Sequence, residues 1–147
     1  MGAAVDTLAF LLGAWQLERS ITDHRSGTAG SFSGKATLAA ADAGSQIPER
    51  AHYEESGELR FGACRSSARR ALDYVRLNDG CVLLCFADGR PFIEVDLSEG
   101  TCSRTHDCGP DIYEIEMVVI SHDLVQERWR VRGPSKDYSA VTALSRK

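Results

Sequence analysis

From Gly13 onward, apolar and polar residues alternate with a period of two, and this alternation constrains the fold more than any other feature of the sequence. A period of two is typical of a β-strand that has one face in a core and the other in water. Turn-forming residues separate the alternating runs, and the pairs Asp79-Gly80 and Asp88-Gly89 are typical of tight hairpins. Strands are expected over residues 15–22, 31–38, 52–61, 69–77, 81–86, 91–97, 112–120, 124–132 and 138–145. About nine short antiparallel strands at this spacing predict an all-β barrel or sandwich.

One helix is expected before the first strand. Asp6 or Thr7 can cap its N-terminus, residues 8–12 are apolar, and Gly13 is a natural residue to follow its C-terminus. Such a short apolar helix is better suited to plug one end of a sheet than to stand free. With 147 residues and 43% hydrophobic residues, the chain is long enough to bury a core, and we expect residues 1–147 to form one domain.

The charge balance is mildly acidic, with 17 Lys and Arg residues against 21 Asp and Glu residues, a net charge of −4. This balance argues against nucleic acid or an anionic membrane as a partner. An apolar run of about 18 residues, as a transmembrane helix needs, is absent from the sequence. The five cysteines are an odd number and the N-terminus lacks a secretory signal pattern, so we expect a reduced, cytoplasmic protein.

Two of the expected strands are apolar on both faces, over residues 81–86 and 117–120. A strand that is buried on both sides needs cover on both sides. Either the N-terminal helix or a loop provides that cover, or a second copy of the chain does so in a homodimer.

The segment Leu12-Gly13-Ala14-Trp15 joins the expected helix to the first strand, and Arg146 stands near the end of the last strand. Together these features resemble the Gly-x-Trp signature of lipocalins and their relatives. The resemblance implies an antiparallel up-and-down barrel of the lipocalin or calycin type, with about nine strands and a short N-terminal helix. It also implies that Trp15 closes one end of the barrel and that Arg146 packs across the indole as a cation–π contact.

A closer resemblance extends along most of the chain, to an uncharacterised family of small lipocalin-like barrels. The segments that carry it are Phe32-x-Gly34-x-Ala36, Tyr53-x-Glu55-x-Gly57-x-Leu59, Phe86-x-Asp88-Gly89-Arg90-Pro91-Phe92, His106-x-Cys108-x-x-Asp111-x-Tyr113 and Trp129-x-Val131-x-Gly133-Pro134-x-Lys136-Asp137-Tyr138. That family has no established activity, so the resemblance implies a fold and leaves the function open.

Arg19 shares one strand face with three apolar residues, and we expect this face to point into the barrel. A buried guanidinium must be paired, because an isolated buried charge is strongly unfavourable. One interpretation is a structural ion pair with an inward carboxylate, for which Glu55, Glu94 and Asp96 are the candidates. The other is an anchor that holds a ligand carboxylate or phosphate with two hydrogen bonds.

A second group of candidates lies in the polar segment that contains His106, Cys108 and Tyr113. Ordinary loop and strand structure, hydrogen bonding to a small ligand, and a metal or nucleophile site are the three interpretations of this segment. The spacing to the neighbouring Cys102 matches no standard zinc pattern, so no metal site is assigned. Residues two apart in a strand share a face, which leaves a His–Cys nucleophilic pair open.

A third group follows the strand that contains Trp129. Lys136 and Tyr138 either belong to a solvated hairpin turn or lie at the barrel mouth, where they offer a cation and a phenol to a ligand. The full set of candidate binding residues is Arg19, Glu55, Phe92, His106, Tyr113, Trp129, Lys136 and Tyr138.

The leading functional hypothesis is a barrel that binds one small apolar or amphipathic ligand, with an acidic group if Arg19 or Lys136 contacts it. One alternative is an enzyme that uses the same cavity with His106, Tyr113 and Cys108. A haem-binding barrel with His106 as axial ligand is another, and a structural or interaction module is the last. None of the common catalytic or nucleotide-binding motifs occurs, so we assign no catalytic residue or cofactor.

Overall fold

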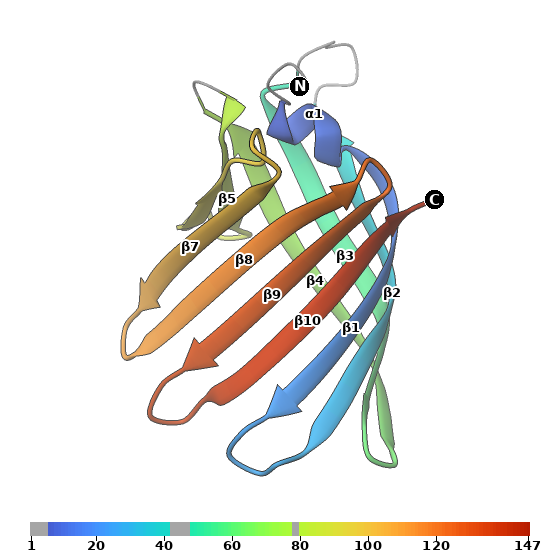
Figure 1. The fold of residues 1–147 in the computed structure, drawn as a ribbon, viewed down its shortest axis with the longest axis vertical. Helices are drawn as coiled ribbons and strands as arrows, with labels where there is room; N and C mark the ends of the chain where they lie inside the picture. The colour runs from blue at the N-terminus through green and yellow to red at the C-terminus, as the bar shows by residue number, and fades with distance from the viewer. Residues whose placement is uncertain (1–5, 42–47, 78–79) are drawn as a thin grey trace.

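The structure is a computed structural model that describes residues 6–41, 48–77 and 80–147. Within these residues, ten antiparallel strands form one sheet that curls into a nearly closed barrel (Figure 1). The strands are β1 (Gly13–Asp23), β2 (Ala29–Ala40), β3 (Arg50–Phe61), β4 (Cys64–Arg76), β5 (Val82–Phe86), β6 (Pro91–Val95), β7 (Thr101–Cys108), β8 (Asp111–Ser121), β9 (Leu124–Arg132) and β10 (Asp137–Arg146). Their order in the sheet is β6-β5-β4-β3-β2-β1-β10-β9-β8-β7. The predicted all-β, antiparallel, up-and-down barrel is confirmed.

β7 is the strand that the alternation pattern does not predict. Its sequence is mostly polar, and among its residues only Cys102 is buried. A strand with so few buried side chains shows no apolar period in the sequence. It nevertheless pairs with β8 along its whole length, with His106 opposite Tyr113.

The helix α1 (Thr7–Leu11) forms where the sequence predicts it. The Asp6 carboxylate caps its N-terminus by accepting a hydrogen bond of 2.9 Å from the backbone N–H of Ala9. Asp6 also forms an ion pair with Arg76 of β4, with 2.8 Å between Nη2 and Oδ1. Thr7 is buried and its hydroxyl accepts a hydrogen bond of 2.9 Å from the backbone of Leu97. These contacts fix α1 to the barrel.

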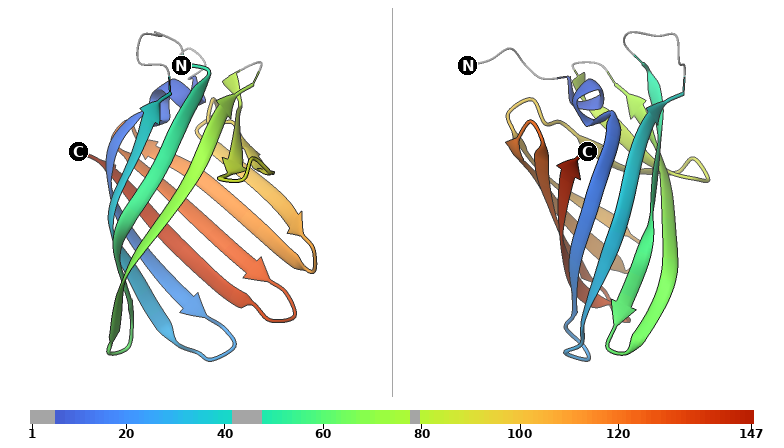
Figure 2. Two further views of the ribbon diagram at one scale, coloured as in Figure 1. Left: turned by 180° about the vertical axis from the view of Figure 1, so that it is seen from behind. Right: turned by 90° about the vertical axis from the view of Figure 1, so that its right-hand side faces the viewer.

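The barrel therefore has two different ends (Figure 2). At the closed end α1 lies across the opening, close to the C-terminus of the chain. At the open end lie the hairpins that join β1 to β2, β3 to β4, β7 to β8 and β9 to β10. Within the part of the chain that the structure describes, the helix is α1, and its five residues are too few to cross a membrane.

The wall of the barrel has a seam between β6 and β7, the two end strands of the sheet, which are not hydrogen-bonded to each other. Aromatic side chains bridge the seam: the ring centroids of Phe92 and His106 are 5.0 Å apart, and those of Phe92 and Trp129 are 5.5 Å apart. Phe86 and Tyr113 complete this group, which we call the seam cluster. Side-chain packing thus replaces backbone pairing at this point.

The turn between β5 and β6 confirms the hairpin predicted at Asp88-Gly89. Gly89 has a φ of 90°, which favours glycine, and its N–H donates to the carbonyl of Phe86 at 2.9 Å. In the other predicted hairpin pair, Asp79 lies outside the described residues.

Candidate functional site

Arg19 lies inside the barrel and forms an ion pair with Glu55 of β3. Two hydrogen bonds join them, Nη1 to Oε2 at 2.8 Å and Nη2 to Oε1 at 3.2 Å. The Nε of Arg19 donates to the buried hydroxyl of Thr142 on β10 at 2.8 Å. Of the three carboxylates that the sequence leaves open as partners, Glu55 is therefore the one that pairs with Arg19. A two-point contact of this kind fixes the orientation of both groups.

A second arginine, Arg70 of β4, reaches the same carboxylate. Its Nη2 donates to Oε1 of Glu55 at 3.2 Å, and its guanidinium carbon lies 5.0 Å from the ring centroid of Trp129, in cation–π geometry. The Nε of Arg70 is buried and has no hydrogen-bond partner among the described residues. The Arg70 side chain as a whole keeps 34% of its surface exposed. Arg70 is thus less fully bonded than Arg19.

The Glu55 carboxylate is the centre of this group, and only 3% of its side chain is exposed. Besides the two arginines, the Tyr53 hydroxyl donates to its Oε1 at 2.7 Å. Burial by itself raises the pKa of Glu55, but the hydrogen bond from Arg19 and the charge of Arg70 outweigh it and bring the pKa below its ordinary value. Glu55 therefore stays ionised at neutral pH.

Next to this charged group, a pocket of about 350 Å³ opens at the open end of the barrel, and we call it the mouth pocket. It combines two guanidinium groups with apolar and aromatic walls. Its lining residues are Arg19, Ile21, Asp23, Leu59, Phe61, Arg70, Trp129, Tyr138 and Ala140.

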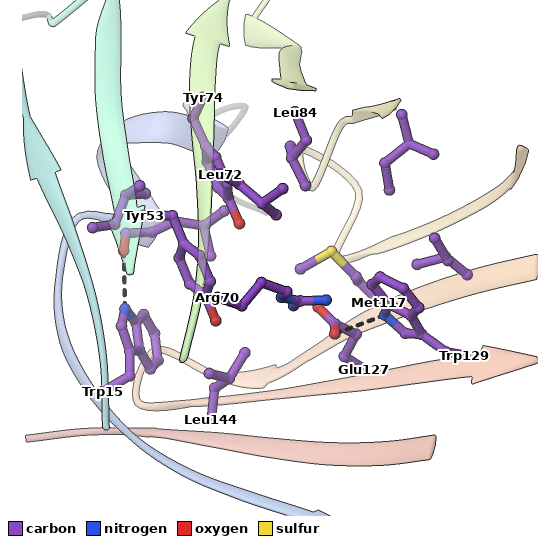
Figure 3. A pocket seen from close by; sticks show the side chains of 14 residues that line it. Trp15, Tyr53, Arg70, Leu72, Tyr74, Leu84, Met117, Glu127, Trp129 and Leu144 are labelled. Carbon is purple, nitrogen blue, oxygen red and sulfur yellow. Dashed lines mark hydrogen bonds between the residues drawn. The ribbon is translucent and has the colours of Figure 1, made fainter. Parts of the chain in front are cut away.

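On the other side of Arg70, toward the closed end, lies an enclosed inner cavity of only about 30 Å³. Arg70 and Trp129 line both spaces and therefore separate them. Figure 3 shows Arg70, Glu127 and Trp129 pointing toward one another in the interior; the indole N–H of Trp129 donates to Glu127 at 2.7 Å. A cavity of this size has room for one or two water molecules. The interior toward the closed end is thus almost filled by side chains.

Three tyrosines near the charged group stay neutral at physiological pH. Burial raises the pKa of Tyr53, Tyr74 and Tyr138 above the ordinary value. Tyr53 and Tyr74 stack with their ring centroids 5.6 Å apart beside the inner cavity, whereas Tyr138 lines the mouth pocket. Tyr138 therefore offers a neutral hydroxyl to anything that enters the pocket.

The structure brings some of the candidate residues together and separates others. Arg19, Trp129 and Tyr138 line the mouth pocket, and Glu55 lies directly behind Arg19. The other four candidates lie outside the pocket: Phe92, His106 and Tyr113 belong to the seam cluster, and Lys136 is half-exposed on the β9–β10 hairpin.

Lys136 contacts the seam cluster from outside. Its Nζ donates to the Tyr113 hydroxyl at 3.4 Å and lies 3.5 Å from a carboxylate oxygen of Asp111. The hydrogen bond to Tyr113 and the nearby Asp111 raise the pKa of Lys136. The ammonium group is thus held on the hairpin by residues of β8.

Trp15 and Arg146 lie at the closed end. The guanidinium carbon of Arg146 is 4.1 Å from the ring centroid of Trp15, and its Nη atoms donate to the carbonyls of Phe10 at 2.8 Å and Leu12 at 3.1 Å. The indole N–H of Trp15 donates to the carbonyl of Leu11 at 2.9 Å. Arg146 therefore occupies the C-terminal carbonyls of α1 and joins the two ends of the chain.

Sequence reasoning did not single out Arg70 or Glu127. The signal was present, because a period of two places Arg70 on the same face as Leu72 and Tyr74, and Glu127 on the same face as Trp129. This is the same argument that identified Arg19, and it applies to any charged residue within an apolar strand face.

Two of the solved structures that match this chain share its fold at low sequence identity. One is the S-type phycobiliprotein lyase CPES from Guillardia theta, with a TM-score of 0.70 and 12% identity, over 96% of this chain and 90% of that chain. The other is a protein of unknown function from the DUF3598 family of Nostoc punctiforme, with a TM-score of 0.55 and 13% identity. That match covers 94% of this chain but only 47% of the Nostoc protein.

At these identities, the similarity is one of fold alone. Among curated proteins, the sequence has no match. A family comparison is more informative, because residues 11–146 match a family of unknown function, DUF6314. The match extends from the end of α1 to the last residue of β10, which includes every strand described above. The chain therefore belongs to DUF6314, a family of unknown function.

Proposed function

We propose that this protein binds a small amphipathic molecule in the mouth pocket. The observation that carries the proposal is the composition of this pocket, in which two guanidinium groups lie against apolar walls. Its volume of about 350 Å³ is within the range of pockets that hold small molecules, roughly 300–1,000 Å³. A few fixed polar groups within an apolar lining are typical of such pockets.

The small volume of the inner cavity also supports the mouth pocket as the binding site. At about 30 Å³, the inner cavity is too small for an organic ligand. A ligand that enters from the open end meets Arg70 and Trp129 before it reaches this cavity. The ligand therefore stays on the open side of the Arg70–Trp129 pair.

The position of the seam cluster favours binding over catalysis. The ring of His106 packs against Phe86, Phe92 and Tyr113, and Cys108 is exposed at the end of β7. Neither residue lines the mouth pocket, so the acid–base and nucleophilic groups considered for an enzyme do not face the proposed ligand. An axial histidine for haem needs an open apolar pocket in front of His106, and aromatic rings fill that space instead.

The proposal is tested by native mass spectrometry of the protein purified from its own host, next to an Ala140→Phe variant. Ala140 is buried and lines the mouth pocket, so a phenyl ring at this position fills the pocket. We expect the wild type to carry a small-molecule mass that the folded variant has lost. An unchanged bound mass in Ala140→Phe, or a wild type without any bound mass, would contradict the proposal.

A further inference from the structure

We infer that the ligand of the mouth pocket is a short apolar carboxylate whose carboxylate group binds to Arg70, an inference that rests on the proposed function. It starts from the unequal hydrogen bonding of the two interior arginines. Arg19 uses three of its nitrogens, two toward Glu55 and one toward Thr142. Arg70 has a single hydrogen bond to a protein acceptor among the described residues, at 3.2 Å.

The one acceptor that Arg70 uses is already shared. Oε1 of Glu55 also accepts hydrogen bonds from Tyr53 and from Arg19, so three donors converge on one oxygen. The other oxygen of Glu55, Oε2, accepts a hydrogen bond from Nη1 of Arg19 at 2.8 Å. Glu55 therefore cannot satisfy the remaining N–H groups of Arg70, a guanidinium that carries five such donors in all.

The other carboxylates near the pocket have partners of their own. Glu127 accepts the indole N–H of Trp129 at 2.7 Å, and no ion pair joins it to Arg70 in the described part of the chain. Asp23 accepts the backbone N–H of Arg25 at 2.9 Å in the β1–β2 hairpin. Arg70 thus combines a buried donor without a partner, a side chain that is one-third exposed, and a position on the pocket wall.

A carboxylate of the ligand supplies the acceptors that Arg70 lacks. It offers two oxygens in the plane that a guanidinium matches, and both hydrogen bonds are strengthened by charge. Tyr138 of β10, whose hydroxyl stays protonated, is a neutral donor that lines the same pocket. The negative charge of Glu127 acts on Arg70 and opposes the ligand anion, so it lowers the affinity for a carboxylate.

The strand register determines how the ligand lies. Going from the interior to the rim along β1, Arg19 is opposite Thr142, Ile21 is opposite Ala140, and Asp23 is opposite Tyr138. The arginines therefore form the inner wall, and the apolar residues lie between them and the rim. A ligand enters with its carboxylate first and leaves its apolar part against Ile21 and Leu59.

The same register limits the length of the ligand. From Arg19 to Asp23 is four residues of an extended strand, or about 14 Å at roughly 3.4 Å per residue. Phe61 packs at the rim over Gly30 of β2, where a Cβ atom would lie 2.5 Å from the ring. A carboxylate with one phenyl ring or a chain of about eight carbons fits this depth, whereas a long acyl chain extends into solvent.

Calorimetric titration with phenylbutyrate and its uncharged isostere phenylbutyramide tests the inference. The proteins are the wild type, Arg70→Gln and the matched control Arg69→Gln, which changes the next residue of the same strand. Arg69 is 76% exposed on the outside of the barrel, where it faces Glu54 at 3.8 Å. The Arg19–Glu55 pair remains in Arg70→Gln, so we expect that variant to fold, as circular dichroism will verify.

We expect phenylbutyrate to bind the wild type at least about tenfold more tightly than phenylbutyramide. Arg70→Gln loses this preference, whereas Arg69→Gln keeps it within about twofold. A direct readout is the ¹⁵N resonance of Arg70 Nε, which we expect to shift with phenylbutyrate and not with the amide. If Arg70→Gln does not fold, this resonance in the wild type decides the question.

Equal affinity for the acid and the amide, or equal binding by Arg70→Gln and the wild type, would overturn the carboxylate inference. The carboxylate inference would also be overturned if neither phenylbutyrate nor phenylbutyramide binds the wild type. The proposed function is decided separately, because a co-purified ligand that Ala140→Phe has lost supports binding in the mouth pocket whatever its charge.

Discussion

The two ends of the barrel both contain an arginine next to a tryptophan, but the two arginines differ in how far their hydrogen bonds are satisfied. At the closed end, Arg146 lies over Trp15 and donates to the carbonyls of Phe10, Leu12 and His122. At the open end, Arg70 lies over Trp129 with one long hydrogen bond to a shared carboxylate oxygen.

This difference separates a structural arginine from a binding one. A guanidinium whose donors are used by the protein stabilises the fold and has little left to offer a ligand. A guanidinium with unused donors beside a pocket is unfavourable until an acceptor arrives, and a ligand can provide that acceptor. The two ends should therefore respond in opposite ways to substitution.

The largest effect is expected at the closed end, from Trp15→Ala. The indole is 3% exposed and is covered by Arg146, so its removal leaves a cavity and breaks the hydrogen bond to Leu11. We expect the free energy of unfolding in urea to fall by about 3–5 kcal/mol. Affinity for phenylbutyrate at low temperature, where the variant is folded, should stay within about twofold of the wild type. A large loss of affinity would show that the two ends are not independent.

The next effect is expected in the charged layer, from Glu55→Gln. Without the carboxylate, Arg19 and Arg70 lose their common counter-ion, and we expect a loss of about 3 kcal/mol at neutral pH. Because the pKa of Glu55 is lowered in the folded protein, its contribution is present above the ordinary value of 4.5 and is lost as the pH falls through the folded pKa. Urea titrations of wild type and variant should therefore converge in acid.

Glu54→Gln is the matched control for this substitution. Glu54 is the preceding residue of β3, and half of its side chain is exposed. We expect it to change the stability by no more than about 0.5 kcal/mol at any pH. Loss of stability that is equal in the two variants would mean that the interior ion pair contributes nothing of its own.

A smaller effect on stability and a specific effect on binding are expected from Gly30→Ala. The new methyl group would lie 2.5 Å from the ring of Phe61, which lines the mouth pocket, so the ring must shift. Such overpacking costs about 1–2 kcal/mol, and we expect phenylbutyrate to bind several-fold more weakly by calorimetry. Adding Phe61→Leu removes the clash, so the double variant should recover the lost affinity. If the affinity does not recover, the Phe61 ring is not the group that restricts binding at the rim of the mouth pocket.

The smallest effect is expected between the two ends, from Tyr74→Phe, and only at high pH. Burial raises the pKa of Tyr74, so the phenol favours folding below its ordinary value of 10.0 and this contribution is lost as the pH rises toward the folded pKa. At neutral pH we expect a change below about 1 kcal/mol. Above pH 10 the variant should lose less stability than the wild type in urea titrations. Parallel losses would show that Tyr74 ionises freely in the folded barrel.

The fold could be predicted from the sequence because most strands have one buried and one exposed face. β1 is typical, with Trp15 and Leu17 buried, Gln16 partly exposed between them and Glu18 exposed after them. β7 escaped this reasoning because most of its side chains are exposed, so its place depends on backbone pairing with β8, which leaves no period in the sequence.

The candidate site could be predicted only in part. Period-two reasoning placed Arg19 inside the barrel and named Glu55 among its partners, because both lie on apolar strand faces. It could not choose among three carboxylates, since that choice depends on which strands become neighbours across the barrel. The positions of His106 and Tyr113 likewise follow from barrel closure at the seam, a property of the whole sheet.

One ¹H–¹⁵N correlation spectrum tests the central claim, which is that the open end binds a ligand and the closed end stabilises the fold. The protein has two tryptophans, and each end contains one of them, so the spectrum contains one indole N–H signal for each end. On titration with phenylbutyrate, the Trp129 signal is predicted to move and to saturate while the Trp15 signal stays in place. Movement of the Trp15 signal without the Trp129 signal, or of neither, would contradict the account.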